Sequence, residues 1–172
     1  PWEQADVLSL DAATGSVRWK GTRGKSRVGH VTPILVDGGA QIVSAGGDRV
    51  QGFNARTGER SWSIYGQGEG VTPSSRVGDG LILTSPGFAA PTIRAIRLGG
   101  KGDVTNSHIV WEQTKGGPVL ASPLYVHPHL YTITRDNILH CIEASTGDVV
   151  WLRRLSGVHS ASPVFADGRI YV

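Results

Sequence analysis

The chain has 172 residues, of which 39% are hydrophobic, and a formal net charge of +3 at pH 7. This length is typical of one domain with its own core. No apolar run approaches the roughly 20 residues of a membrane-spanning helix, so we expect no transmembrane segment. The 24 glycines and 9 prolines predict many tight turns. Because methionine is absent, we expect a fragment or a processed form.

The first distinctive segment is rich in glycine and in basic side chains. It reads RWKGTRGKSR and covers residues 18–27. A surface that binds nucleic acid would need such side chains interleaved with aromatic rings along a groove or a sheet. Here they follow Trp19 in a glycine-rich connection. We therefore predict a solvent-exposed loop rather than a patch that binds polyanions, and no nucleic acid among the partners.

The remaining segments predict short strands joined by tight turns. A pair of strands is expected at residues 7–20, and hairpins around Asp-Gly-type turns are expected at 34–45, 75–85 and 164–172. Further runs at 49–55 and 138–144 each precede a Thr-Gly turn and a run that carries tryptophan. No stretch has apolar residues at helical spacing over about ten positions, so the chain is predicted to be all-β.

Two landmarks recur along the chain with the same period. Trp19, Trp62, Trp111 and Trp151 follow one another at steps of 43, 49 and 40 residues. A proline preceded by serine or threonine recurs at Pro33, Pro73, Pro123 and Pro163, at steps of 40, 50 and 40 residues. A period of about 40 to 50 residues is typical of the four-stranded blades of a β-propeller.

One nine-residue phrase ends at three of these tryptophans. It reads DAATGSVRW at 11–19, NARTGERSW at 54–62 and EASTGDVVW at 143–151. Its glycine follows a threonine at a turn where a positive φ is expected, which glycine adopts without a steric penalty. The polar residue four positions earlier is expected to accept hydrogen bonds from the turn. Each tryptophan is predicted to pack against the next blade.

This pattern resembles the blades of the quinoprotein-like family, also called pyrroloquinoline quinone (PQQ) repeats, which carry a tryptophan-docking motif. The residues that carry the resemblance are Asp11, Thr14, Gly15, Trp19, Thr57, Gly58, Trp62, Trp111, Thr146, Gly147 and Trp151. The third unit departs from the pattern, because AIRLGGKGDVTNSHIVW puts a longer loop before Trp111. The resemblance implies an all-β propeller of four-stranded antiparallel blades.

The repeat divides one domain, residues 1–172, into blade parts. They are expected at 1–27, 28–66, 67–115, 116–156 and 157–172, with strands c and d in the first part and strands a and b in the last. This is about four blades' worth of sequence. It fits a closed four-bladed ring, a homodimer in which two copies complete one ring, or a piece of a seven- or eight-bladed propeller. We favour the piece, because a chain that ends after strand b leaves an unpaired edge.

Candidate binding residues lie in loops at one rim and near the central channel. Rim loops are the usual recognition surface of such a scaffold. The candidates are Asp48, Arg49, Arg135, Asp136 and Asn137 between strands b and c, and His30 and His159 before strand a. Turn chemistry in the loops, and a structural hydrogen-bonded role for the two histidines, are the alternatives.

No catalytic centre and no metal site are predicted. The resemblance implies that an enzyme of this family would bind PQQ with calcium and, in many members, carry a pair of adjacent cysteines. This chain has one cysteine, Cys141, which is expected to be buried and inert. His127 and His129 flank a proline, but two imidazoles are fewer ligands than a metal site needs. We expect no cofactor, with PQQ and calcium as the alternative.

The resemblance implies a non-catalytic scaffold outside the cytoplasm, in a bacterial periplasm, that binds a protein or a small ligand on the propeller face. The family includes the scaffold lipoprotein of outer-membrane protein assembly. One alternative is part of a PQQ-dependent dehydrogenase whose cofactor site lies in other blades. A second alternative is the sensor domain of a membrane-attached kinase.

Overall fold

A computed structural model describes residues 2–27, 32–46, 48–66, 72–85 and 91–172. Within these ranges nearly all regular structure is β-strand, and apart from one two-residue strand the strands of each sheet follow one another in chain order. The prediction of an all-β propeller with four-stranded antiparallel blades is confirmed. Among the described residues, no helix combines the length and apolar character needed to cross a membrane.

Three sheets contain four consecutive antiparallel strands each. The first contains β3 (Ile34–Val36), β4 (Gln41–Gly46), β5 (Arg49–Asn54) and β6 (Arg60–Tyr65). The second contains β7 (Arg76–Gly78), β8 (Leu81–Thr84), β9 (Ile93–Arg97) and β11 (Ile109–Gln113). The third contains β12 (Leu124–Val126), β13 (His129–Ile133), β14 (Ile138–Glu143) and β15 (Val149–Arg154).

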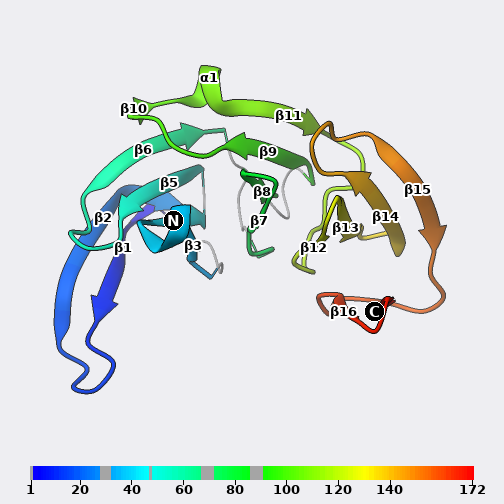
Figure 1. The fold of residues 1–172 in the computed structure, drawn as a ribbon, viewed down its shortest axis with the longest axis horizontal. Helices are drawn as coiled ribbons and strands as arrows, with labels where there is room; N and C mark the ends of the chain where they lie inside the picture. Colours follow the sequence, from blue (N-terminus) through cyan, green and yellow to red (C-terminus); the bar gives the residue numbers. More distant parts are fainter. Residues whose placement is uncertain (1, 28–31, 47, 67–71, 86–90) are drawn as a thin grey trace.

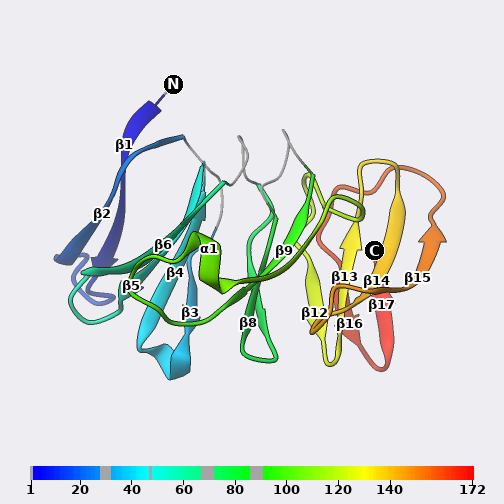
Figure 2. The same ribbon diagram turned by 90° about the horizontal axis from the view of Figure 1, so that it is seen from above.

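Two-stranded sheets flank these three. One pairs β1 (Trp2–Leu10) with β2 (Val17–Arg27), and the other pairs β16 (Val164–Ala166) with β17 (Arg169–Tyr171). The five sheets follow an open arc, with β1 and β2 at one end and β16 and β17 at the other (Figure 1). Figure 2 shows the sheets side by side from above. The two end pairs belong to separate sheets, so they do not close a four-bladed ring within this chain.

The Ser/Thr-Pro landmarks mark hydrogen bonds between neighbouring sheets. The backbone N–H of Thr32 donates to Ser74 Oγ at 3.2 Å, and that of Ser74 donates to Ser122 Oγ at 2.9 Å. The N–H of Ser122 continues the series to Ser162 Oγ at 2.9 Å. These three bonds link the entry of each blade to the entry of the next.

The a-to-b hairpins turn on an aspartate followed by glycine. Asp37, Asp79 and Asp167 have φ of 53°, 51° and 49°, a conformation that aspartate tolerates better than most residues. In the first sheet this turn is a short 3-10 helix, η1 (Asp37–Gly39). These turns fix the register, so that Ile34 faces Val43 and Arg76 faces Leu83.

The basic segment after Trp19 is a strand, and the prediction of a loop beyond residue 20 was wrong. β2 extends to Arg27 and pairs with β1 along its whole length. Arg23 is buried at 5% exposure, where its guanidinium donates to Gly46 O at 2.8 Å and to Arg49 O at 3.1 Å. The glycines misled the prediction, because here they allow close packing: a Cβ on Gly21 would lie 2.7 Å from Gly58 O.

The long segment before Trp111 returns to the preceding sheet. Its strand β10 (Gly102–Asp103) pairs in parallel with β6 and makes a fifth strand there. A single helical turn, α1 (Thr105–His108), follows it. The N–H of Val104 donates to Ser63 O at 3.0 Å, and the N–H of Tyr65 donates to Thr105 Oγ1 at 3.0 Å. This segment therefore joins two blades along their outer edge.

The hydrophobic core lies between adjacent sheets rather than within them. One cluster joins Val43, Val50 and Trp62 of the first complete sheet to Ile82 and Ile96 of the second. Another joins Leu83, Ile93 and Ala95 of the second to Leu130, Ile142 and Ala144 of the third. Alternating side chains cover both faces of each sheet, so each blade is stabilised by its neighbours.

Candidate functional site

The Thr-Gly turns are built by side chains that the nine-residue phrase supplies. Asp11 Oδ1 accepts from the N–H groups of Ala13 and Thr14 at 3.1 and 2.9 Å. Asn54 Oδ1 accepts from the N–H groups of Arg56 and Thr57 at 2.9 and 3.0 Å. Hydrogen bonds from Arg18 first, and then from Thr14, lower the pKa of Asp11. The same carboxylate thus anchors the turn and pairs with a strand residue.

Glu143 stands at the same place in the third complete sheet but bonds differently. Its longer side chain accepts from Ser145 Oγ at 3.1 Å, while Thr146 Oγ1 donates to Asp148. All three turns share one backbone bond, from the glycine N–H to the carbonyl four residues earlier, at 2.8 to 2.9 Å. Gly15, Gly58 and Gly147 have φ of 72°, 75° and 83°.

Two tryptophans dock on the Thr-Gly turn of the next sheet. Trp19 Nε1 donates to Ala55 O at 2.9 Å, and Trp111 Nε1 donates to Ala144 O at 3.0 Å. The indole rings lie on the glycines: a Cβ on Gly58 would be 2.5 Å from Trp19, and one on Gly147 would be 2.7 Å from Trp111. Each contact therefore needs both a positive φ and an absent side chain.

Trp62 and Trp151 are placed differently. The sheet after Trp62 has no Thr-Gly turn, and Trp62 is 1% exposed, covered by the cluster that contains Val104. Its Nε1 donates to Gln41 Oε1 of its own sheet at 3.0 Å. Trp151 is 41% exposed and contacts Tyr131, with ring centroids 5.9 Å apart. Equivalent tryptophans therefore have three environments: docked on a turn, buried in the core, or partly exposed.

Three of the predicted binding residues line one hollow, which we call the rim cavity. It measures about 190 Å³ and is lined by Arg135, Asn137 and His159 together with apolar side chains that include Leu120 and Val158. Asn137 organises it: its Oδ1 accepts from the His159 N–H at 2.9 Å, and its carbonyl accepts from the Leu155 N–H at 2.9 Å. The b-to-c loop of one blade is therefore bonded to the connection that follows strand d.

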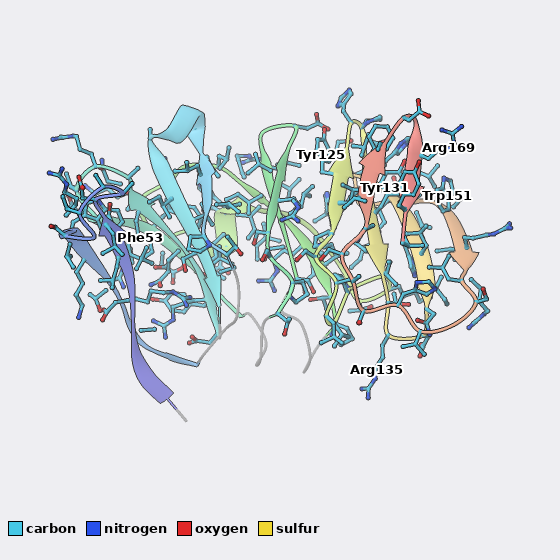
Figure 3. All side chains as sticks on the ribbon, turned by 90° about the horizontal axis from the view of Figure 1, so that it is seen from below. Phe53, Tyr125, Tyr131, Arg135, Trp151 and Arg169 are labelled. Atoms are coloured by element: carbon cyan, nitrogen blue, oxygen red, sulfur yellow. The ribbon has the colours of Figure 1, made fainter. Side chains whose placement is uncertain are left out.

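Arg135 projects outward from this rim (Figure 3). Figure 3 shows it projecting on the side opposite Tyr125 and Arg169. Leu120 is 53% exposed and Val158 is 90% exposed. The cavity thus combines exposed apolar surface with a cation, a combination that is enriched where proteins bind one another.

The other candidates do not join this cavity. Asp48 pairs with Arg49 at 2.7 Å, and that hydrogen bond raises the pKa of Arg49, whose guanidinium lies 5.2 Å from the Tyr65 ring centroid. Asp136 accepts through its backbone carbonyl from Arg154 at 3.3 Å. His30 lies outside the described residues.

His127 and His129, which flank Pro128, each lie beside a carboxylate. His127 Nδ1 lies 3.0 Å from Asp79 Oδ1 of the preceding sheet and 3.0 Å from Tyr125 Oη, and His129 Nε2 lies 3.7 Å from Glu143. Burial first, and then Asp79, raise the pKa of Tyr125 to about 12. In the described part of the chain, no group of three or more His, Cys, Asp or Glu side chains is placed to hold a metal ion.

Cys141 is fully buried, and burial raises the pKa of its thiol. Sequence reasoning missed its neighbour, His140, whose Nδ1 is buried without a hydrogen-bond partner. It also missed Lys115. Lys115 and His140 both line a cavity of about 510 Å³ between the second and third complete sheets. The available signal was the repeat itself, because aligning the blades puts His140 at the place of Gln51.

Comparison with known proteins gives one consistent family. The family model described as outer membrane protein assembly factor BamB matches residues 3–105 and 100–172. Curated BamB proteins are 25% identical in Nitrosomonas eutropha, over 98% of this chain and 42% of the relative, and 26% identical in Bordetella pertussis, over 95% and 43%. The chain thus spans less than half the length of these relatives.

Solved structures with the same fold include BamB from Moraxella catarrhalis. Its TM-score is 0.68 at 20% identity, covering 91% of this chain and 46% of that chain. The computationally designed Ika8 protein has a TM-score of 0.71 at 10% identity, covering 95% of this chain and 48% of that one. At such identities these structures support the fold alone.

Proposed function

The chain belongs to the family of the outer membrane protein assembly factor BamB, and from this premise we propose that it is part of a non-catalytic binding scaffold outside the cytoplasm. The observation that carries the proposal is the family match along almost the whole chain. The relatives are named as assembly factors of outer membrane proteins. Such a factor works by holding a partner, for which a rigid set of blades with exposed loops is well suited.

We place the partner-binding surface at the rim cavity. The bond from Asn137 to the His159 N–H fixes the cavity wall, and Arg135 projects beside the exposed side chains of Leu120 and Val158. Aromatic residues and arginine carry much of the energy of protein interfaces, and apolar side chains exclude water around them. We therefore expect a protein partner that presents an apolar residue next to a carboxylate.

The experiment is complementation in a bacterium from which its own BamB has been deleted. The full-length protein that contains this chain should restore outer membrane protein abundance and resistance to detergent. Arg135→Ala together with Leu120→Ala should reduce this restoration. Arg169→Ala, which removes an arginine on the opposite rim (Figure 3), is the matched control and should leave restoration unchanged.

Two results would contradict the proposal. One is a full-length protein that is folded and exported but restores nothing. The other is a saturable change in the absorption spectrum on addition of PQQ and calcium, which would favour the dehydrogenase alternative. Fractionation of the cells checks the extracytoplasmic location in the same samples.

A further inference from the structure

A buried polar side chain recurs on strand c of every complete sheet. In each sheet the tryptophan on strand d is paired with a small residue, namely Gly52, Ala95 or Cys141. The residue just before each of these is polar and buried: Gln51 at 0%, Arg94 at 7% and His140 at 7% exposure. All three side chains face the preceding sheet, and we call the contact surface between two adjacent sheets a seam.

Protein groups satisfy this position at the first two seams. Gln51 Oε1 accepts from Arg23 Nε at 3.2 Å, and Gln51 Nε2 donates to Ser63 Oγ at 3.4 Å. Arg94 binds the Glu112 carboxylate and donates to Gly66 O at 3.2 Å. Buried polar groups in proteins are nearly always bonded in this way, so an exception needs an explanation.

The third seam is the exception. His140 Nδ1 is buried without a partner, and its nearest neighbour across the seam is Gly116, where a Cβ would lie 2.8 Å away. Lys115 stands four residues after Trp111, as Arg23 stands four residues after Trp19. However, Arg23 is inserted into its seam, whereas Lys115 is exposed and leaves a cavity of about 510 Å³ beside His140.

The lining of this seam cavity defines a ligand chemistry. Pro91, Val119 and Ile138 supply apolar surface, and Lys115 supplies a cation at the edge. Burial lowers the pKa of His140, so the ring is neutral at pH 7 and keeps one N–H to donate. Arg135 and Asp136 also line the cavity, and both are exposed, so the charged side chains of the lining sum to one positive charge.

We propose that the seam cavity binds a small carboxylate with an apolar body, held between the Lys115 ammonium and the His140 imidazole. The carboxylate accepts from the Lys115 ammonium and from the Nε2–H of His140, because Nδ1 is enclosed beside Gly116. The apolar body of the ligand covers Pro91, Val119 and Ile138. Charge-assisted hydrogen bonds of this kind are stronger than neutral ones. The second seam offers an internal precedent, because there the Glu112 carboxylate binds Arg94. The volume lies within the range of small-molecule sites.

The test is a titration of the full-length protein with benzoate, followed by NMR of histidine labelled with ¹³C at Cε1. His140→Gln, which introduces the residue of the first seam, assigns the signal. Benzoate should shift the His140 signal to saturation. Benzamide, which has nearly the same shape without the charge, should not shift it over the same concentrations.

Lys115→Gln tests the cation, and because Lys115 is exposed this variant should fold normally. It should weaken benzoate binding by about fivefold or more at low salt. Lys101→Gln, which removes an exposed lysine outside the cavity, is the matched control. An unmoved His140 signal, equal binding of benzamide, or unchanged affinity in Lys115→Gln would each overturn the proposal. The partner-binding rim is tested by other variants, so the two proposals fail separately.

Discussion

At the scale of single residues, the docking contact depends on glycine for two separate reasons. Gly58 has φ +75° and carries the Trp19 ring, whereas Gly15 has φ +72° and nothing within 4 Å of its missing Cβ. Gly58→Ala should therefore lower the free energy of unfolding by about 2–5 kcal/mol, because it combines backbone strain at a positive φ with overpacking against the indole ring. Gly15→Ala should cost only the backbone part, about 1–2 kcal/mol. Urea denaturation measures both, and equal losses would show that the ring contact adds nothing.

Sequence reasoning reached the turns because their bonds are local. Asp11 and Thr14, or Asn54 and Thr57, lie three residues apart, so the phrase contains the whole turn. Aligning the repeats places His140 at the position of Gln51, but it does not give the surroundings of His140, which come from another blade through Gly116. The strand pattern around His140 is that of an ordinary apolar strand, and only the finished seam shows that its Nδ1 lacks a partner.

His140 should make stability depend on pH. Burial lowers its pKa in the folded state below the ordinary value of 6.5, so between the two pKa values the unfolded chain binds more protons. Stability from this group is therefore complete above pH 6.5 and falls as the pH drops toward the folded pKa. His140→Gln should remove this part of the acid sensitivity. The check is urea denaturation of both proteins at pH 7.5 and pH 5; the same acid-induced loss in both would exclude His140 as its source.

At the scale of elements, the segment before Trp111 replaces a missing docking turn. The sheet that follows Trp62 has no Thr-Gly turn, so β10 returns to pair with β6, and Val104 enters the core at 5% exposure. The sequence showed only that this segment is long. A parallel pairing with the previous blade leaves no local signal, because it depends on where β6 lies in space.

Val104 should carry much of the stability of this segment. Val104→Ala removes two buried methyl groups next to Trp62 and should cost about 1–3 kcal/mol. Val110, on the adjacent strand β11, is 40% exposed, and Val110→Ala should cost less than about 1 kcal/mol. Hydrogen exchange gives a second readout, because the Tyr65 N–H bonds to Thr105 Oγ1 and should lose protection in Val104→Ala alone. Similar losses in both variants would mean that the segment only covers the surface.

At the scale of the whole molecule, the repeated blades form the arc. Side chains in the middle of the arc are covered by neighbouring blades, whereas those at its end are not. The period of the tryptophans and prolines predicted the blades. The proline landmark marks a hydrogen bond at three successive seams, and two of the tryptophans dock on the next sheet. The rim cavity was only partly accessible from sequence. Rim loops were predicted, but the bond from Asn137 to His159 depends on how one blade meets the next connection.

The end of the arc exposes side chains whose equivalents are buried elsewhere. Val164 pairs with Tyr171 as Ile34 pairs with Val43, yet Val164 and Tyr171 are 58% and 49% exposed while Val43 is 1% exposed. An apolar face beside an open strand edge favours association.

We therefore expect the 172-residue chain alone to have a mean mass above that of a monomer in light scattering. A dimer mass fits two arcs that complete one ring. Val164→Lys with Tyr171→Lys should shift the mass toward the monomer, while Leu35→Lys, at a position 66% exposed on β3, should not. A monomeric parent chain would contradict this expectation, and circular dichroism confirms that the variants keep their sheets.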